Sequence, residues 1–209
     1  MLSVFKIKPY QNKKIETFQK IAIKELNNFF KSDWKYDSVN ILIAENRATF
    51  DSLSGFKTKD WMIGFAINNN IIVLLSPNKF QPESCHTYSD IEYFKLIKHE
   101  ISHIYINTIF GKCNFDWINE GFCCYLSNQI TRIEKFRGFL DAKNLYTESG
   151  YAIKLLAEKY GDEKLIKLLK AQSGCNDNKL LQNHFNRIYG ANPDYIFFNQ
   201  LLSTSVNPK

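Results

Sequence analysis

Two histidines and a glutamate form the group in this sequence whose types and spacing are best suited to chemistry. His99, Glu100 and His103 lie in the stretch HEISH, which has the pattern H-E-x-x-H. Residues four positions apart share one face of a helix, so both imidazoles can reach a single metal ion. Zinc binds neutral imidazole nitrogens at about 2.0–2.1 Å and accepts a further ligand and a water. Glu100 lies about 100° around the helix from His99, where it can take a proton from a zinc-bound water.

The plainer interpretation of HEISH is a solvent-facing pair of histidines on an ordinary helix. The chain has four histidines, and a chance H-E-x-x-H is expected in roughly one of a couple of hundred such compositions. The residues around the motif are strongly apolar, which predicts a helix at the centre of the fold. A carboxylate at a suitable distance along the chain also favours a metal site.

That carboxylate is Glu120, in the stretch WINEGF. Sixteen residues separate it from His103, enough to finish one helix, turn and begin a second helix antiparallel to the first. Glu120 then faces the histidines and completes a His₂Glu set, the open arrangement of catalytic zinc sites. Taken alone, Glu120 is an acidic residue early in a helix, where the helix dipole favours it.

These motifs resemble those of a known family. HEISH followed by DWINEGFCCYL is similar to the gluzincin metallopeptidases, the thermolysin-like clan that includes relatives of aminopeptidase N. The shorter gap between the two motifs brings the chain nearer to small peptidase MA-like domains, and the resemblance covers roughly residues 61–202. It implies a thermolysin-like zincin fold, a Zn²⁺ cofactor and Glu120 as third ligand.

The resemblance also implies a tyrosine that stabilises the oxyanion. Counting back from Gly161 gives Tyr146, and Tyr151 is the alternative. Two positions depart from the family pattern. Ile67 stands where aminopeptidases have the glutamate that binds a free amine, which argues against aminopeptidase activity. Cys124 stands where many thermolysin relatives have an aspartate that orients a ligand.

The expected activity is hydrolysis of a peptide bond by a zinc-bound water that Glu100 activates, with Tyr146 steadying the oxyanion. A peptide or protein substrate would lie extended along an edge strand within residues 61–76 and pair through its backbone. The rival hypothesis is a non-catalytic interaction module that retains a zincin fold. An open His₂Glu set argues against the rival, because structural zinc sites fill the fourth position with protein.

The remaining histidines and cysteines have simpler interpretations. His86 and His184 have no partner at ligand spacing, so a surface or capping role is expected. Cys123 and Cys124 are interpreted as small core residues. The five cysteines are an odd number in a chain that does not need disulfide staples, which favours reduced thiols.

Hydrophobic periodicity supplies the elements that must position these residues. Apolar residues alternate with charged ones at helical spacing in residues 11–34, and the β-branched residues 38–44 predict a strand. Asn68, Asn69 and Asn70 join two apolar runs and predict a hairpin. Residues 46–55 are expected to form a short helix or a turn, and Pro77 and Pro82 a loop. The other expected helices run from residue 89 to Gly111, from the cap Asp116 to about residue 130, and over residues 150–160, 162–171, 178–189 and 193–202.

The expected strands thus concentrate before Pro77 and most of the expected helices follow it. This segregation predicts an α+β fold with a small N-terminal mixed sheet lobe, residues 1–88, and a helical lobe, residues 89–209. Both lobes are expected to form a single catalytic domain, residues 1–209, which suits a chain of 209 residues.

Composition narrows the classes of partner. The net charge is +6 at pH 7, but the lysines are scattered over the polar faces of helices, which argues against nucleic acid. The longest apolar run is too short to cross a bilayer, and the N-terminus lacks a signal-peptide pattern. The sequence therefore predicts a soluble, cytoplasmic protein with no membrane partner, and leaves its oligomeric state open.

Overall fold

The computed structural model describes residues 7–175 and 177–206, and within them the chain forms a mixed α+β structure that is mostly helical. Nine α-helices, two short 3₁₀ helices and one three-stranded sheet occur in these described residues. The chain divides into two compact units, the first ending at Ile104 and the second beginning at Tyr105. The boundary between the two units falls within one helix.

The sheet belongs to the first unit. Its strands are β1 (Asn40–Ala44), β2 (Gly64–Ile67) and β3 (Ile71–Leu75), in the order β1-β3-β2. The pairing of β1 with β3 is parallel and that of β2 with β3 is antiparallel, so the sheet is mixed as expected. The predicted hairpin is confirmed: Asn68 adopts a positive φ of 55° directly after β2, which asparagine tolerates.

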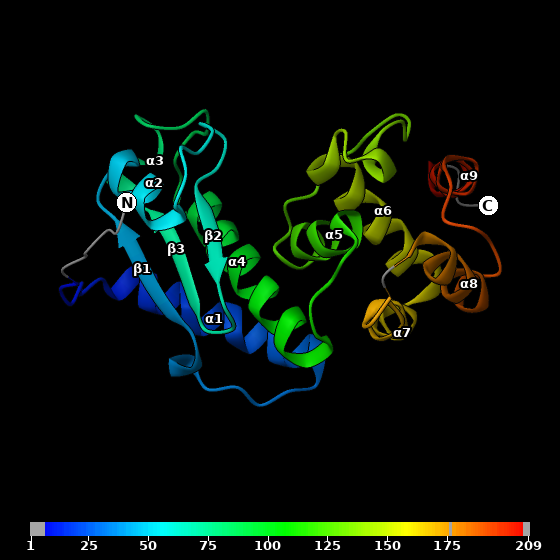
Figure 1. Cartoon of the computed structure of the whole chain (residues 1–209), viewed down its shortest axis with the longest axis horizontal. Coiled ribbons are helices and arrows are strands. Elements are labelled where there is room, and N and C mark those ends of the chain that lie inside the picture. Colours follow the sequence, from blue (N-terminus) through cyan, green and yellow to red (C-terminus); the bar gives the residue numbers. More distant parts are fainter. Residues whose placement is uncertain (1–6, 176, 207–209) are drawn as a thin grey trace. The chain divides into compact units, whose positions relative to one another are not determined.

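Helices cover both faces of this sheet (Figure 1). On one face, Phe50 of α2 meets Phe65 of β2 with 5.0 Å between ring centroids. On the other face, Gly64 approaches Leu96 of α4. The helices of the first unit are α1 (Lys13–Phe30), α2 (Arg47–Ser54), α3 (Pro77–Phe80) and α4 (Asp90–Phe110), with the 3₁₀ helix η1 (Tyr36–Ser38) before β1.

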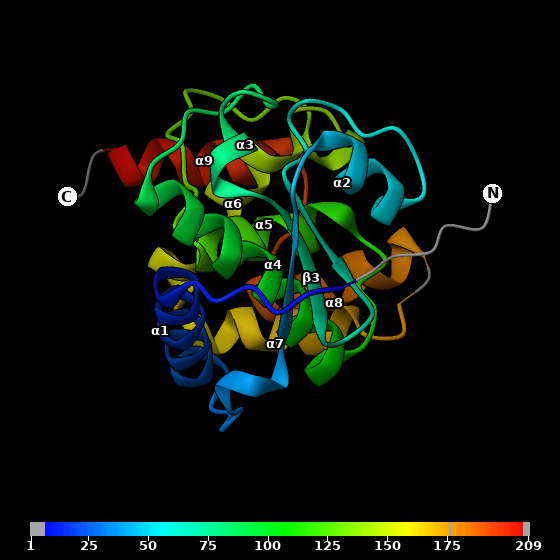
Figure 2. The same ribbon diagram turned by 90° about the vertical axis from the view of Figure 1, so that its left-hand side faces the viewer.

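Helix α1 lies beside α4, as both views show (Figures 1 and 2). Phe18 and Phe94 pack with ring centroids 5.5 Å apart. The ammonium group of Lys98 donates a hydrogen bond of 2.5 Å to Glu25. Apolar packing and a polar rim therefore hold α1 against the helix that carries HEISH.

Helix α6 is the centre of the second unit, because it packs against α5, α7 and α9. Trp117 anchors an aromatic core, with ring centroids 5.5 Å from Phe139 and 5.9 Å from Phe198. The elements of this unit are α5 (Asp116–Leu126), the 3₁₀ helix η2 (Phe139–Asp141), α6 (Leu145–Tyr160), α7 (Asp162–Gln172), α8 (Asn178–Tyr189) and α9 (Tyr195–Val206).

Most expected helices and strands are found, but several boundaries were wrong. Helix α1 stops at Phe30 because the side chain of Asn27 binds both backbone groups of Trp34, at 2.9 and 3.0 Å, and turns the chain. Helix α3 lies where a loop was expected, since Pro77 fits the first turn of a helix. Asp116 does not cap α5: Phe115 occupies that position, with no side-chain hydrogen bond.

Helix α6 begins at Leu145 and not at Gly150. Its additional turn contains Glu148, whose carboxylate binds the preceding loop, and local periodicity did not reveal this. None of the helices in the described residues is both long and apolar enough to cross a membrane.

Candidate functional site

The two histidines of HEISH lie one turn apart on α4, within the first unit. Their ring centroids are 5.0 Å apart, and a ring nitrogen of His99 lies within 4.8 Å of one of His103. Two nitrogens bound to one zinc ion lie about 3.4 Å apart, given bonds of about 2.1 Å and tetrahedral angles. Small rotations of the side chains therefore suffice for both imidazoles to hold one ion, and this pair fits zinc.

The burial of His99 argues against a solvent-facing pair of histidines. His99 is 7% exposed, and Ile101 and Ile104 of the same helix are fully buried. The expectation of a central helix is thus confirmed for α4. A buried imidazole needs a partner for its ring nitrogens, and a metal ion is one group that meets this need.

Glu100 lies next to the ligand pair and against the edge of the sheet. Its side chain is 6% exposed. A Cβ atom built on Gly64 would lie 2.8 Å from Oε1 and 3.0 Å from Cγ of Glu100. Because residue 64 is a glycine, the carboxylate of Glu100 has room beside β2.

The edge of β2 that does not face β3 can be assigned from the hydrogen bonds of the sheet. The carbonyl oxygen of Ile63 accepts a hydrogen bond of 2.9 Å from the N–H of Leu75, so Ile63 points toward β3. Backbone groups alternate in direction along an antiparallel strand. The N–H and C=O groups of Gly64 and Ala66 therefore point to the outer edge, as the expected edge strand requires.

Helix α5 carries the proposed third ligand, in the second unit. Glu120 is half-buried and lies in the second turn of the helix. Gly121 follows it and packs closely on α6, where an added Cβ would lie 2.8 Å from Cγ1 of Ile153 and 2.9 Å from the carbonyl oxygen of Ser149. Glu120 thus stands on a helix whose position against α6 is tightly defined.

Cys123 is a candidate ligand that the sequence analysis assigned to the core. It is fully buried on α5, three positions after Glu120, and is not part of a disulfide. Residues three positions apart lie on neighbouring parts of one helix face. Its thiol, like the carboxylate of Glu120, is a donor that zinc accepts. The signal was present in the sequence, since a thiolate is a common zinc donor.

The two candidate tyrosines are both on α6 but differ in exposure. Tyr146 is 42% exposed. Tyr151 is 7% exposed, its ring centroid lies 6.4 Å from that of Phe136, and the ammonium group of Lys154 lies 5.4 Å above its ring. Five positions along a helix correspond to a rotation of about 140°, so the two tyrosine side chains leave the helix in different directions and only one can reach a given oxyanion.

Glu148 positions the first turn of α6, a role that could not be predicted from the sequence. Its Oε2 accepts hydrogen bonds from the backbone N–H groups of Arg137 and Gly138, both at 2.9 Å, and of Phe139 at 3.2 Å. Burial raises the pKa of Glu148, but these bonds and one from Asn144 outweigh burial and hold the pKa below its ordinary value. The carboxylate thereby orders the loop before Tyr146.

The other histidines and cysteines differ from the candidate ligands. Nε2 of His86 lies 2.8 Å from the carbonyl oxygen of Trp61, which is a hydrogen bond that ties two loops together. His184 is half-buried on α8. None of the five cysteines, all of which lie in the described residues, forms a disulfide, and Cys85 is the exposed one.

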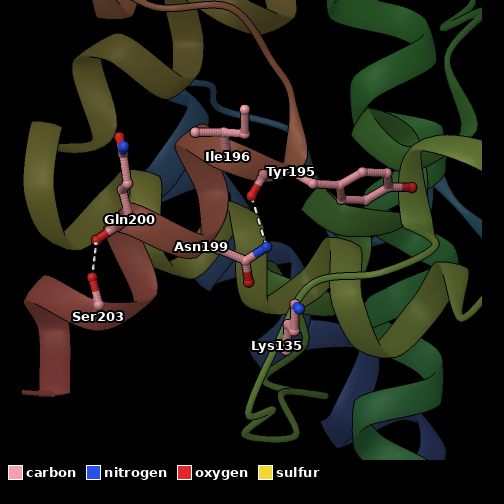
Figure 3. Close-up of a pocket in the computed structure, with 6 residues that line it drawn as sticks. All are labelled: Lys135, Tyr195, Ile196, Asn199, Gln200 and Ser203. Atoms are coloured by element: carbon pink, nitrogen blue, oxygen red, sulfur yellow. Dashed lines mark hydrogen bonds between the residues drawn. The ribbon is translucent and has the colours of Figure 1, made fainter.

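A shallow pocket in the second unit lies outside this set of residues (Figure 3). It is formed along α9 and by Lys135, and Figure 3 shows the side chain of Asn199 bonded to the backbone of Tyr195. Its lining holds no histidine, cysteine or carboxylate: Lys135, Tyr195, Ile196, Asn199, Gln200 and Ser203. Metal chemistry is therefore not expected in this pocket.

Comparison with known proteins gives no relative from which a role could be transferred. No protein family model matches the chain. No curated protein matches its sequence either. The function of the chain must therefore be inferred from its own residues.

Proposed function

We propose that the chain is a zinc-dependent metallopeptidase of the gluzincin type that hydrolyses internal peptide bonds. One observation carries the proposal: two imidazoles with ring nitrogens within 4.8 Å share a face of α4, beside a buried carboxylate. That carboxylate, Glu100, also lies against Gly64 of the edge strand. A pair of candidate metal ligands, a candidate general base and an edge strand thus lie within the first unit.

In this proposal His99 and His103 hold the ion, and α5 supplies the third ligand. Glu120 is our choice because a His₂Glu set leaves a position open, as catalytic sites require. Cys123 is the alternative donor on the same helix. Zinc, when bound, supplies a Lewis acid that polarises a carbonyl oxygen and lowers the pKa of a water molecule.

Glu100 is the general base. Its carboxylate takes a proton from the attacking water as the oxygen adds to the scissile carbonyl carbon. It then gives that proton to the leaving amine as the C–N bond breaks, so that the carboxylate is restored. The contact with Gly64 supports this role, because a peptide that pairs with β2 would bring its backbone to the base.

Tyr146 is proposed to donate a hydrogen bond to the oxyanion of the tetrahedral intermediate. Its exposed side chain supports this choice over Tyr151, which is buried with its ring near that of Phe136. The finer fold assignment, a thermolysin-like zincin with all residues in one catalytic domain, is part of the same proposal. An α+β chain whose three strands all lie before Pro77, with most of its helices after them, is what supports it. A cytoplasmic location also stays a prediction.

The test combines metal analysis with a broad peptide substrate. Purified protein should contain about one zinc per chain by elemental analysis and should cleave a quenched fluorescent peptide library. Glu100→Gln should retain the zinc and lose hydrolysis by at least about 100-fold, since general base catalysis contributes 10²–10⁴-fold. Glu16→Gln, at an exposed position on α1, is the matched control and should behave like the unmodified chain.

The third ligand is decided by two further variants. Glu120→Gln should lower zinc affinity if the carboxylate binds, and Cys123→Ser should lower it if the thiolate binds. Substitution with Co²⁺ separates the two, because only a thiolate ligand adds a sulfur-to-cobalt charge-transfer band in the near ultraviolet. That band, absent from Cys123→Ser, would replace Glu120 with Cys123 in the proposal.

The rival class is a non-catalytic interaction module, and the cysteine at position 124 favours it, since many thermolysin relatives carry an aspartate there. A zinc-loaded chain that cleaves no member of the library, with Glu100→Gln indistinguishable from it, would establish the rival. Cleavage that persists in Glu100→Gln would remove Glu100 from the mechanism.

A further inference from the structure

The outer edge of β2 is open over a short length. Met62 is the next outward-facing residue before Gly64, and its backbone is already occupied. Its carbonyl oxygen accepts a hydrogen bond of 2.5 Å from Nη1 of Arg47, and its N–H donates one of 3.1 Å to Lys59. A peptide added to this edge therefore pairs with the backbone groups of Gly64 and Ala66.

Phe65 lies between these two residues and on the opposite face of the sheet. The position of a Cβ on Gly64 points to Glu100 and Leu96 of α4, so side chains at even positions of β2 face α4. Phe65 faces the other way, toward α2, where its ring meets Phe50 edge to face at an angle of 76°. The Phe65 side chain is only partly buried, so a part of the ring remains open to a neighbour.

The geometry of an antiparallel pair determines what that neighbour is. When Gly64 and Ala66 exchange hydrogen bonds with an added strand, Phe65 occupies a position that makes none. Residues in such positions face one another at a Cα–Cα distance of about 4.5 Å, closer than the hydrogen-bonded pairs. Their side chains lie on the same face of the sheet and pack together. The peptide residue opposite Phe65 must therefore place its side chain against the phenyl ring.

From this we infer that Phe65 is a specificity-determining residue that favours an aromatic or β-branched side chain in the peptide. The Glu100 carboxylate lies beside Gly64, so the bond to be cleaved lies near the peptide residue that pairs with Gly64. The preferred residue is its neighbour in the peptide, the one that pairs with Phe65. Aromatic–aromatic and aromatic–β-branched pairs across strands are the favourable ones. This inference rests on the proposed peptidase function and defines its substrate class as peptides with a bulky residue next to the cleaved bond.

The experiment first finds a cleaved member of the quenched library and locates the cleaved bond by mass spectrometry. Each position within three residues of that bond is then changed in turn to Phe, Tyr, Val, Ile, Ala or Ser, and kcat/KM is measured. The unmodified chain should favour Phe, Tyr, Val and Ile by up to about five-fold at one position, the size of a cross-strand pair.

Phe65→Ala should abolish the preference at that position alone and leave the preferences elsewhere unchanged. Phe65→Leu keeps an apolar side chain against Phe50, and should retain the preference for Val and Ile while it loses that for Phe and Tyr. The second variant serves if Phe65→Ala does not fold. Phe56→Ala removes a phenyl ring of 59% exposure outside the strand, and should keep the full profile.

The outcomes separate the inference from the function on which it rests. Peptides cleaved with the same profile by the unmodified chain and both Phe65 variants would overturn the inference and leave the peptidase intact. A profile that changes equally in Phe56→Ala would overturn it too. A zinc-loaded chain that cleaves nothing would overturn the proposed function and the inference together.

Discussion

The carboxylate of Glu100 lies where the side chain of residue 64 would otherwise be. A Cβ atom on Gly64 would come within 2.8 Å of Oε1, a separation that real Cβ atoms do not reach. The backbone at Gly64 has no need of a positive φ. A side chain added at position 64 would therefore compete for space with the side chains of Glu100 and Leu96, without straining the backbone.

Gly64→Ala tests this relationship. The added methyl group should displace Glu100 from the strand edge and lower peptide hydrolysis by about 10- to 100-fold, the effect of misplacing a catalytic group by about 1 Å. Zinc content should not change, because the histidines are on other positions of α4. The check is kcat/KM together with elemental analysis.

The double variant Gly64→Ala with Glu100→Gln is the control for this prediction. If the methyl group acts through the base, it should cost nothing further in hydrolysis once the base is gone. Full activity in Gly64→Ala alone would show that the close approach has no part in catalysis.

Metal binding should depend on both histidines of α4. His99→Ala and His103→Ala should each weaken zinc binding by about 100-fold or more, because each removes a direct ligand, and changes of residues that only support ligands cost 10–100-fold. Competition with a chromogenic chelator measures the affinity without any need for hydrolysis. His184→Ala, on α8, should bind zinc like the unmodified chain. Equal zinc affinity in all three variants would contradict the metal site.

The contact between α5 and α6 should be sensitive to a single methyl group. A Cβ on Gly150 would lie 2.7 Å from Cβ of Cys124, and neither atom can rotate away. Gly150→Ala should therefore destabilise the chain by about 1–3 kcal/mol through overpacking, measured by urea unfolding. This sign is diagnostic, since alanine in place of glycine within a helix otherwise stabilises it by about 1 kcal/mol. A more stable variant would refute the close packing.

Gln172 should be replaceable with a gain in stability. It is fully buried on α7, and neither polar atom of its side chain has a hydrogen-bond partner among the described residues. Burying an amide without partners costs about 1–3 kcal/mol, so Gln172→Met should raise the free energy of unfolding by a similar amount. Gln200→Met, at an exposed position, should change it by less than about 0.5 kcal/mol. A loss of stability in Gln172→Met would point to a buried water that binds the amide.

Glu148 should make the stability depend on acid pH. Its pKa in the folded chain is lowered from the ordinary 4.5, so its contribution is complete above that value and is lost as the pH falls through the folded pKa. The stability advantage of the unmodified chain over Glu148→Gln should therefore be largest near neutral pH and shrink below about pH 4.5. Unfolding curves at several pH values measure this difference. Glu163→Gln, on the exposed side of α7, is the control and should show no such trend.

Features that depend on neighbours along the chain could be predicted from the sequence. Helix geometry alone brings His99 and His103 together at i and i+4, and an asparagine run alone predicts the hairpin before β3. The three strands and most helices followed from periodicity for the same reason. A local rule suffices where the partners are a few residues apart.

Contacts between residues distant in sequence could not be predicted and became known from the three-dimensional structure. The approach of Glu100 to Gly64, the packing of Gly150 on Cys124 and the burial of Gln172 each join separate elements. Hydrophobic periodicity indicates which face of a helix or strand is buried, but not which residues of other elements that face contacts. The start of α6 at Leu145 was missed for the same reason, because the backbone groups that Glu148 binds lie 9 to 11 positions before it.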